Sequence, residues 1–349
     1  MTFEEARALF PALERVAYLN AGSMGPLAIP MFETVQSELR RQLEEGRGGL
    51  PFFERMVELR AGVRQQLAGL LGVAQENLAL TTSTTEACNI VLSGLDLGPE
   101  DEIVTSATEH FGLLGALQVS GASIRVAPDD GIVDAVTDRT RLIAISHVSW
   151  VTGNSLEPAR VKEQTGLPIL VDGAQSVGAI PVDAGPFDYY TVSCQKWLCG
   201  PDATGGLYVR DAESLRIAWP SYFSQEKHER DGTFQPWPTA ARFDPAWIPP
   251  ASLAGLLAAL GLAPEWRYDR IAELAAACRD RLAERYEVVT APGQAGLVSF
   301  RPGEDPEEVS ARLYEQGVVV RFLPGTDLVR VSCGWWNNEE DLERLLAAL

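Results

Sequence analysis

The segment SCQKWLCGPDATGGLYV, residues 193–209, places Lys196 among small, apolar and glycine residues. Lysine is otherwise rare, because the 29 basic residues include only Lys162, Lys196 and Lys227. An arginine is always protonated, whereas a lysine amine can be neutral in a desolvated pocket and can then attack a carbonyl carbon. Lys196 is therefore the first candidate for amine chemistry.

Three other segments carry polar groups where a ligand could bind. Asp172 ends the apolar run LPILVD, and a buried carboxylate is costly unless it meets a cation. His110 lies between a predicted strand and a predicted helix in TSATEHFGLLGAL. Ser83-Thr84-Thr85-Glu86 resembles a capping box and places hydroxyls and free backbone N–H groups at a helix start, where phosphates bind.

A phosphate site, a buried carboxylate, a flat imidazole and a lysine amine are together the parts that hold pyridoxal 5′-phosphate. Lys196 would bind its aldehyde as an imine, and Asp172 would keep the ring nitrogen protonated so that the ring accepts electrons. His110 could stack on the ring, and Gln175 could donate to the phenolic oxygen. The remaining predicted cofactor-binding residues are Thr84, Thr85, Ser193 and Gln195. No metal site is predicted.

The elements that must position these groups follow from the apolar pattern. Strand-length apolar runs alternate with segments of helical period, which is typical of a sheet covered by helices. The predicted strands are 77–82, 102–106, 123–128, 141–147, 167–172, 189–193 and 205–210. Polar residues end these strands, and ligands gather at the carboxyl ends of strands in such α/β folds.

The pattern of predicted helices and strands changes near residue 250. One or two long helices are followed by short strands and two further helices, which indicates a smaller α+β domain. We expect a large cofactor-binding domain over residues 15–250 and a small C-terminal domain over 251–349, with residues 1–14 packing against the latter. Residues 217–250 are rich in aromatics and prolines and are expected to form a long loop at a pocket or an interface.

VDGAQSVG followed by SCQKWLCGPDATGGLYV resembles the class V aminotransferase family, which includes cysteine desulfurases and related lyases with the fold-type I architecture of pyridoxal-phosphate enzymes. The similarity extends to YLNAGSMGPL, STTEACN, TEHFGLL, SHVSWVTGN and LVRVSCGWWNNEEDLERLL, and thus covers nearly the whole chain. It implies a large domain with a seven-stranded, mostly parallel sheet.

The resemblance also implies roles for individual residues. Lys196 would carry the cofactor, Asp172 and Gln175 would hold its ring, and His110 would stack on it. Arg330 would bind the substrate carboxylate, as a guanidinium fork can with two hydrogen bonds. The other expected substrate-binding residues are Asn20 and Trp150.

Three residues differ from the pattern of cysteine desulfurases and bear on which branch of the family this chain resembles. Gln195 precedes the lysine where desulfurases usually have histidine, which resembles the small-molecule aminotransferase branch. Trp150 stands where asparagine is common, as in lyases that resemble cystine C–S lyase. Trp247 replaces a threonine that in the family reaches the partner's cofactor phosphate, and it could instead line the neighbour's pocket.

The first prediction of function is a class V aminotransferase-like enzyme that acts on a small amino acid through an external aldimine and a quinonoid. The alternative is a C–S β-lyase, and a cysteine desulfurase is ranked below both. Desulfurases need a reactive thiolate on a mobile loop, whereas PGTDLV before Arg330 is short and lacks cysteine. A non-catalytic scaffold is disfavoured by the complete residue set, and a dinucleotide or S-adenosylmethionine enzyme by the lack of GxGxxG.

The composition of the chain limits which classes of partner are expected. The net charge of −19 and the pI near 4.6 argue against a nucleic-acid partner. The opening MTFEEARALFPALERV does not resemble a signal peptide, and no apolar stretch reaches membrane length, so a cytoplasmic protein without a membrane partner is expected. The five cysteines form no disulfide framework and are expected as reduced thiols. The family resemblance implies a homodimer.

Overall fold

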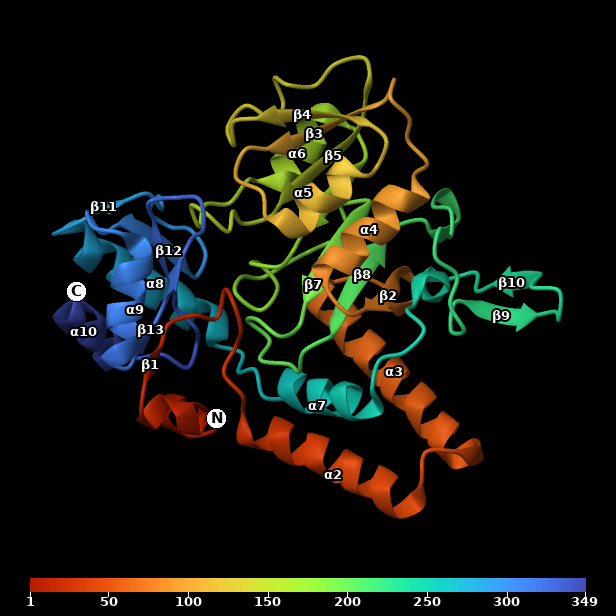
Figure 1. Cartoon of the computed structure of the whole chain (residues 1–349), viewed down its shortest axis with the longest axis horizontal. Helices are drawn as coiled ribbons and strands as arrows, with labels where there is room; N and C mark the ends of the chain where they lie inside the picture. The colour runs from red at the N-terminus through yellow and green to blue at the C-terminus, as the bar shows by residue number, and fades with distance from the viewer.

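The computed structural model describes residues 1–349 and shows two units with a pocket where they meet. A large α/β unit contains the middle of the chain, and a smaller α+β unit contains its C-terminal part (Figure 1).

The large unit is built on one seven-stranded sheet with the order β2-β8-β7-β6-β5-β3-β4. All neighbours pair in parallel except β8, which is antiparallel to both β2 and β7. The predicted seven-stranded, mostly parallel sheet is thereby confirmed. The strands are β2 (Leu78–Thr81), β3 (Glu102–Ser106), β4 (Ser123–Ala127), β5 (Thr140–Ser146), β6 (Ile169–Asp172), β7 (Tyr189–Ser193) and β8 (Gly205–Val209).

Helices cover both faces of this sheet, because side chains along each strand alternate between two apolar cores. In β6, Ile169 and Val171 pack in the core that includes residues of α3, α6 and α7, whereas Leu170 packs in the core beside α4 and α5. The helices of the large unit are α2 (Ile29–Glu45), α3 (Gly49–Leu71), α4 (Thr84–Gly94), α5 (Phe111–Gln118), α6 (Pro158–Thr165) and α7 (Pro250–Leu260).

The small unit is a four-stranded antiparallel sheet with the order β11-β12-β15-β14, covered by helices. Asp305 caps α9 just before Pro306, and Asn338 starts α10 in a capping box with Asp341, so both helix starts are encoded locally. The elements are α8 (Arg267–Ala283), β11 (Glu287–Val288), β12 (Leu297–Arg301), α9 (Pro306–Glu315), β14 (Arg321–Phe322), β15 (Val329–Ser332) and α10 (Glu339–Ala348).

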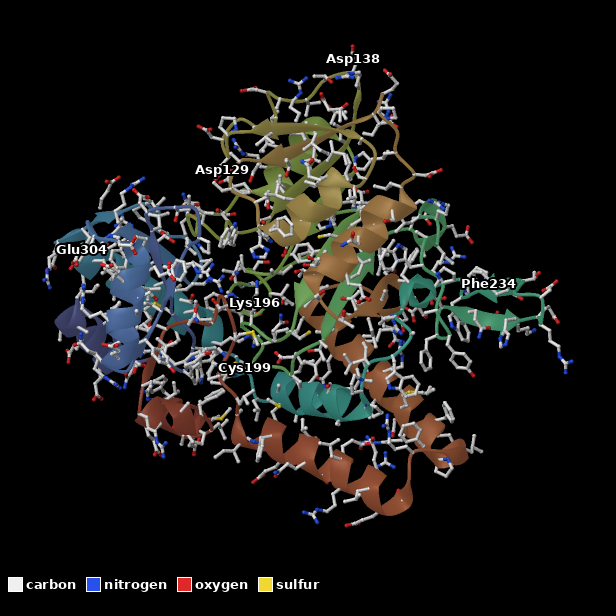
Figure 2. The ribbon with its side chains drawn as sticks, viewed as in Figure 1. Asp129, Asp138, Lys196, Cys199, Phe234 and Glu304 are labelled. Carbon is white, nitrogen blue, oxygen red and sulfur yellow. The ribbon has the colours of Figure 1, made fainter.

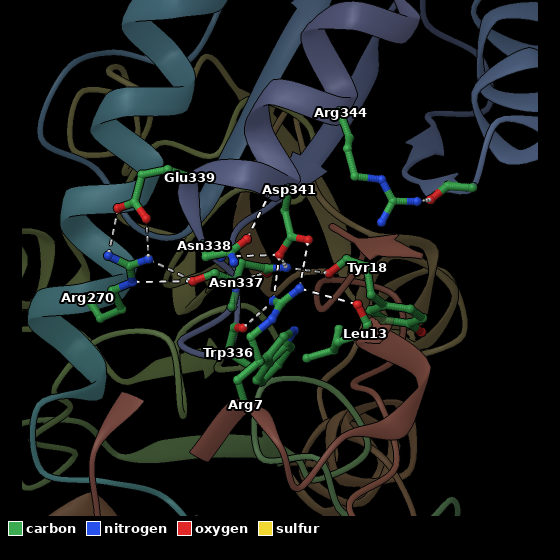
Figure 3. A network of polar contacts seen from close by, with 12 residues as sticks. Arg7, Leu13, Tyr18, Arg270, Trp336, Asn337, Asn338, Glu339, Asp341 and Arg344 are labelled. Atoms are coloured by element: carbon green, nitrogen blue, oxygen red, sulfur yellow. Dashed lines mark hydrogen bonds and ion pairs between the residues drawn. The ribbon is translucent and has the colours of Figure 1, made fainter. Parts of the chain in front are cut away.

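The N-terminal segment is tied to the small unit. Strand β1 (Ala17–Tyr18) pairs in parallel with β13 (Val318–Val319). Arg7, in α1 (Phe3–Arg7), donates to both carboxylate oxygens of Asp341 at 2.8 and 3.1 Å (Figure 3). Asn337 links the same carboxylate to the carbonyl of Tyr18. The first residues of the chain are thus held beside its last helix.

The expected division of the chain at residue 250 stays a proposal, and the packing favours two changes to it. Leu253, Ala254 and Leu256 of α7 are buried in the core of the large unit, so a boundary between α7 and α8 fits better. The β1 residues, which we expected in the large domain, extend the small unit by pairing with β13. Neither change was visible in local sequence, because both depend on packing between distant segments.

Residues 217–250 are more ordered than the predicted loop. A hairpin of β9 (Gln225–His228) and β10 (Phe234–Pro236) projects from the body of the molecule (Figure 1). Its turn contains Asp231 and Gly232, and Gly232 adopts a φ of +90°, which glycine tolerates best. The dipeptide Asp-Gly between strand-length segments was a hairpin signal.

Asp244 anchors this segment to the sheet. Its carboxylate accepts from Arg60 at 2.8 Å, from Arg64 at 2.7 Å and from the backbone N–H of Leu80 at 2.8 Å, and it is buried. Leu80 lies in β2, which leads directly into the start of α4.

The structure contains no helix with the length and apolarity needed to cross a bilayer. All five cysteines are buried and none forms a disulfide.

We predict that Asp244→Ala lowers the free energy of unfolding by about 3–5 kcal/mol, because it leaves two inward guanidinium groups without their anion. Glu304→Ala is the matched control, since it removes an exposed ion pair with Arg312 and should cost less than about 1 kcal/mol. Urea unfolding of both variants measures the difference. Equal losses would show that Asp244 does not anchor the segment.

Candidate active site

A pocket lies at the carboxyl ends of the large-unit strands, where the small unit meets them, and Lys196 lies in this central region (Figure 2). It draws residues from the loops after β2, β3, β5, β6 and β7, from the N-terminal segment and from β14 and β15. The lining residues are Gly22, Ser23, Ser83, Thr84, Thr85, His110, Trp150, Gln175, Ser193, Gln195, Lys196, Arg321 and Arg330.

The predicted site residues converge on this pocket with two exceptions. Asp172 is buried at the end of β6 and does not line the pocket surface. Asn20 does not line it either: its carbonyl accepts from the backbone N–H groups of Ser23 and Met24, in a turn that brings Gly22 and Ser23 to the pocket instead. The side-chain oxygen of Asn20 is buried without a hydrogen-bond partner, and its contact with substrate stays a prediction.

Lys196 lies in the tight connection between β7 and β8. Cys199 donates its backbone N–H to the carbonyl of Lys196, and Gly25 donates to the carbonyl of Gln195 at 2.7 Å. A Cβ on Gly25 would lie 2.2 Å from the Lys196 carbonyl oxygen, so only glycine permits this approach. The N-terminal segment thus fixes the backbone that carries the lysine.

The Lys196 amine is prepared for nucleophilic and base chemistry. Burial lowers its pKa to about 8, Arg330 and Arg321 act in the same direction, and the charge of Asp172 opposes them. Lys162, by contrast, pairs with Asp188 at 2.6 Å, and Lys227 is exposed on β9. Only one of the three lysines lies in the pocket.

Asp172 is a buried carboxylate without an ion pair. One oxygen accepts from the backbone N–H of Ala174 at 2.8 Å and lies 3.4 Å from the hydroxyl of Thr191. It ends β6, three residues before the pocket-lining Gln175, and its charge acts to raise the pKa of both Lys196 and His110. A buried carboxylate that lacks a cation suits a ligand that brings a protonated nitrogen.

His110 begins α5 as its N-cap. Its Nδ1 accepts from the backbone N–H of Gly112 at 3.0 Å, which assigns the neutral ring with the proton on Nε2. Burial and Lys196 both lower the pKa of this imidazole. Its ring meets Trp150 edge-on, with centroids 5.0 Å apart and planes at 88°.

Buried hydrogen bonds join the two loops that carry these rings. Glu109 accepts from the backbone N–H of Ser146 at 2.9 Å and from the hydroxyl of Ser106 at 2.8 Å, and burial raises its pKa to about 7. The hydroxyl of Ser149 donates to Thr108 at 2.9 Å. The loops after β3 and β5 are therefore held as one unit.

The start of α4 forms the predicted cradle, but the capping box is only half made. Ser83 accepts from the backbone N–H of Glu86 at 3.1 Å. Glu86 does not return to Ser83; its carboxylate accepts instead from Thr82. The first N–H groups of the helix, at Thr84 and Thr85, lack intrahelical acceptors and suit an anion such as phosphate.

The opposite side of the pocket carries two arginines without acidic partners. Arg330 is 1% exposed; it donates to the carbonyl of Trp150 at 2.9 Å, and its Nε is buried without an acceptor. Burial, with help from Arg321, lowers its pKa to about 9. Arg321 and Arg330 lie opposite one another across β14 and β15, and both approach the hydroxyl of Ser23. This side of the pocket suits a carboxylate.

Arg321, Gly22 and Ser23 were not predicted. A signal for Arg321 was present, because PGTD indicates a turn and counting outward from it places residue 321 opposite residue 330. For Gly22 no local signal existed. A Cβ there would lie 2.9 Å from Arg330 Nη2, so the glycine is needed only because Arg330 approaches it.

Gln175 lines the pocket and joins the loop after β6 to the N-terminal segment. Its amide nitrogen donates to the carbonyl of Gly22 at 2.9 Å, and its amide oxygen accepts from the indole of Trp197 at 3.1 Å. Trp247 packs against Phe52 and Phe223 of its own chain and is 41% exposed, and the hypothesis that it lines a neighbour's pocket stays a prediction.

Comparisons with known proteins support this arrangement. The isopenicillin N epimerase of Amycolatopsis lactamdurans is 32% identical over 381 residues, covering 96% of this chain and 94% of the relative. A probable cysteine desulfurase of Halalkalibacterium halodurans is 27% identical over 402 residues, covering 100% and 97% of the two chains.

Two solved structures of C-DES are also similar over almost the whole chain. One is a mutant with glycine covalently linked to its pyridoxal-phosphate cofactor, and it matches with a TM-score of 0.92 at 28% identity over 98% of both chains. The other is the cystine C–S lyase C-DES in complex with its reaction product cysteine persulfide, with a TM-score of 0.90 at 28% identity over 97% and 98%. The model of the family described as aminotransferase class-V matches residues 30–345. The similar solved structures have the type I fold of pyridoxal-phosphate enzymes, and the two units of this chain have the same fold. Together with the family match, this shows that the chain belongs to the class-V aminotransferase family.

Proposed function

We propose that this protein is a pyridoxal-phosphate-dependent C–S β-lyase that acts on a small amino acid of the cysteine type. The observation that carries the proposal is one lysine amine with a lowered pKa, set between a buried unpaired carboxylate and two unpaired arginines. The likeness to a cystine C–S lyase over nearly the full chain supports this reaction over the transamination ranked first from the sequence.

The residues present fit the cofactor. Thr84, Thr85 and Ser193 would hold the phosphate. The Ser193 hydroxyl, which donates to the amide oxygen of Gln195 at 2.9 Å, would turn its hydrogen to the phosphate. Asp172 would face the ring nitrogen, which would give this carboxylate its cation. Lys196 would hold the aldehyde carbon covalently. When bound, pyridoxal phosphate supplies an electron sink for the bond that breaks at the substrate α-carbon.

His110 and Gln175 would complete the ring site. The neutral His110 ring can lie against the cofactor face without adding charge there. Gln175 keeps a second amide N–H beyond the one given to Gly22, and this would donate to the phenolic oxygen.

Lys196 would also be the base that removes the α-proton. Its lowered pKa makes the neutral amine accessible near neutral pH, which general-base catalysis requires. Arg330, with Arg321 beside it, would hold the substrate carboxylate and thereby fix which α-carbon bond faces Lys196.

In the proposed reaction, the electron pair left at Cα expels the sulfur leaving group from Cβ, which for cystine is the persulfide anion of cysteine. For cystine the balance is cystine and water giving pyruvate, ammonia and cysteine persulfide. No enzyme thiol takes part, because no cysteine lines the pocket and all five are buried. Leu323 to Leu328 close a tight turn between β14 and β15, so there is no long loop to carry a nucleophilic thiol to the substrate.

A second candidate is epimerisation at Cα, which the 32% identity to an isopenicillin N epimerase favours. The same lysine would remove the α-proton, but the proton would return to the opposite face and no leaving group would depart. The two reactions therefore differ in their products rather than in their first proton transfer.

We predict that the purified holoenzyme converts cystine to pyruvate and persulfide in equal amounts, without a keto-acid acceptor. Pyruvate, sulfane sulfur and the chirality of remaining substrate should be measured together. Loss of optical activity without pyruvate would favour the epimerase. Amine transfer that requires an added keto acid would favour the aminotransferase that was ranked first from the sequence. A stoichiometric persulfide on an enzyme cysteine would contradict the lyase proposal and indicate a desulfurase.

We further propose that the chain forms a homodimer through the aromatic part of residues 217–250. Trp219 is 66% exposed and Tyr222 is 64% exposed, so this segment presents two large aromatic side chains close together in sequence, unlike a single exposed side chain. A hollow beside the cradle is lined by Ser83, Thr85 and Trp219, so a partner seated there would also approach the phosphate side of the site.

Light scattering at micromolar concentration should give twice the monomer mass. The double substitution Trp219→Ser and Tyr222→Ser should raise the dimer dissociation constant at least about tenfold, since hot spots are enriched in such aromatics. Tyr314→Ser, at a 69% exposed tyrosine on α9, is the control and should change nothing. A monomer at all concentrations would contradict the proposal.

A further inference from the structure

A buried chain of hydrogen bonds connects residues at the ends of β5 and β6 with β7, and none of its side chains lines the pocket. The Nδ1 of His147 lies 2.7 Å from the hydroxyl of Tyr190, which lies 2.6 Å from the hydroxyl of Ser176. Ser176 donates to the carbonyl of Gly173 at 3.1 Å. Tyr190 and Ser176 are fully buried, and Tyr190 belongs to the apolar core on the α3 side of the sheet. Polar groups in such a core are costly unless they are paired.

The donors and acceptors of this chain match in one direction. Burial lowers the pKa of His147 to about 4, so its imidazole is neutral and carries one N–H. Since Ser176 donates to Gly173, its oxygen accepts from Tyr190, and Tyr190 accepts from the Nδ1–H of His147. Each hydroxyl thus donates one hydrogen bond and accepts one. The two hydroxyls are already used within the protein, which indicates a role in positioning rather than in binding a ligand.

Both ends of the chain bond to the backbone that carries Asp172. The backbone N–H of His147 donates to the Asp172 carbonyl at 2.9 Å, and the backbone N–H of Ser176 donates to the Gly173 carbonyl at 3.1 Å. The Tyr190 ring packs against the same place, because a Cβ on Gly173 would lie 2.4 Å from its Cε1. The segment that follows β6 is therefore held by its two carbonyls and by the ring of Tyr190.

The turn held in this way orients the Asp172 carboxylate. Its Oδ1 accepts from the backbone N–H of Ala174 at 2.8 Å and lies 3.4 Å from the hydroxyl of Thr191. Ala174 lies between Gly173, which the chain holds, and the pocket-lining Gln175. Both contacts use Oδ1, so the other oxygen is the one that would face a protonated nitrogen.

We infer that Tyr190 is a positioning residue, whose hydroxyl fixes the turn after β6 so that the Asp172 carboxylate meets the ring nitrogen of the cofactor. A functional group must be held within about 0.5 Å of its working position by the residues that support it. The inference rests on the proposed function, because it takes Asp172 to face that nitrogen.

The test removes the hydroxyl alone. Tyr190→Phe keeps the ring that packs against Gly173. The probes are pyridoxamine 5′-phosphate, which cannot form an imine with Lys196, and its deaza analogue, in which carbon replaces the ring nitrogen. Fluorescence titration of the full chain, freed of cofactor, gives a dissociation constant for each. The substitution should weaken binding of pyridoxamine 5′-phosphate about tenfold, equivalent to about 1.4 kcal/mol, and change binding of the deaza analogue less than about twofold.

Tyr189→Phe is the matched control. Tyr189 is the preceding residue of β7, but its side chain packs in the core on the opposite face of the sheet, so its substitution should change binding of both probes less than about twofold. Ser176→Ala breaks the same chain with a smaller change and should reproduce the selective loss. It decides the question if Tyr190→Phe does not fold.

Other outcomes would overturn the inference. Unchanged binding of both probes would show that the hydroxyl is not needed, and equal weakening of both would show that it supports the pocket as a whole. In an Asp172→Asn background, Tyr190→Phe should have less than about a twofold effect, because interacting residues are not additive. A full tenfold loss there would mean that Tyr190 does not act through Asp172. If the unmodified chain binds both probes equally, Asp172 does not face the ring nitrogen, and the proposed placement of the cofactor fails together with the inference.

Discussion

Three cationic side chains gathered in one pocket without an acidic partner on its lining are the constraint on which the rest of the structure depends. Lys196, Arg321 and Arg330 approach one another in a chain whose net charge is −19, and burial lowers the pKa of Lys196 and of Arg330. Such a cluster is electrostatically unfavourable unless anions enter it. None of the acids of the chain lines this pocket, and Asp172 is buried at the end of β6, three residues before the pocket-lining Gln175.

The scaffold holds this cluster from both units. The large unit supplies Lys196 from the connection between β7 and β8, and the small unit supplies the two arginines from a tight hairpin. The N-terminal segment joins them, since Gly25 fits against the lysine backbone and Gly22 against Arg330. Its anchorage through Arg7 and Asp341 is therefore relevant to the site, although it lies outside the pocket.

Much of this could be predicted from the sequence, where the information is local. The seven strands followed from apolar runs, and Lys196 stood out because the chain otherwise avoids lysine. What could not be predicted depends on contacts between distant segments. The capping box at Ser83 is incomplete because the Glu86 carboxylate accepts from Thr82 instead of from the Ser83 backbone N–H. The position of α7 in the core of the large unit depends on packing against other helices. Asn20 closes a turn through its backbone carbonyl, which residue type alone does not indicate.

Lys196 is the one lysine that lines the pocket and is therefore the residue that would anchor the cofactor. Borohydride reduction of the purified holoenzyme, followed by proteolysis and mass spectrometry, locates the residue bonded to the cofactor directly. We expect one phosphopyridoxyl label per chain, on the peptide that contains Lys196. A label on Lys162, which is paired with Asp188, or on the exposed Lys227 would contradict the account.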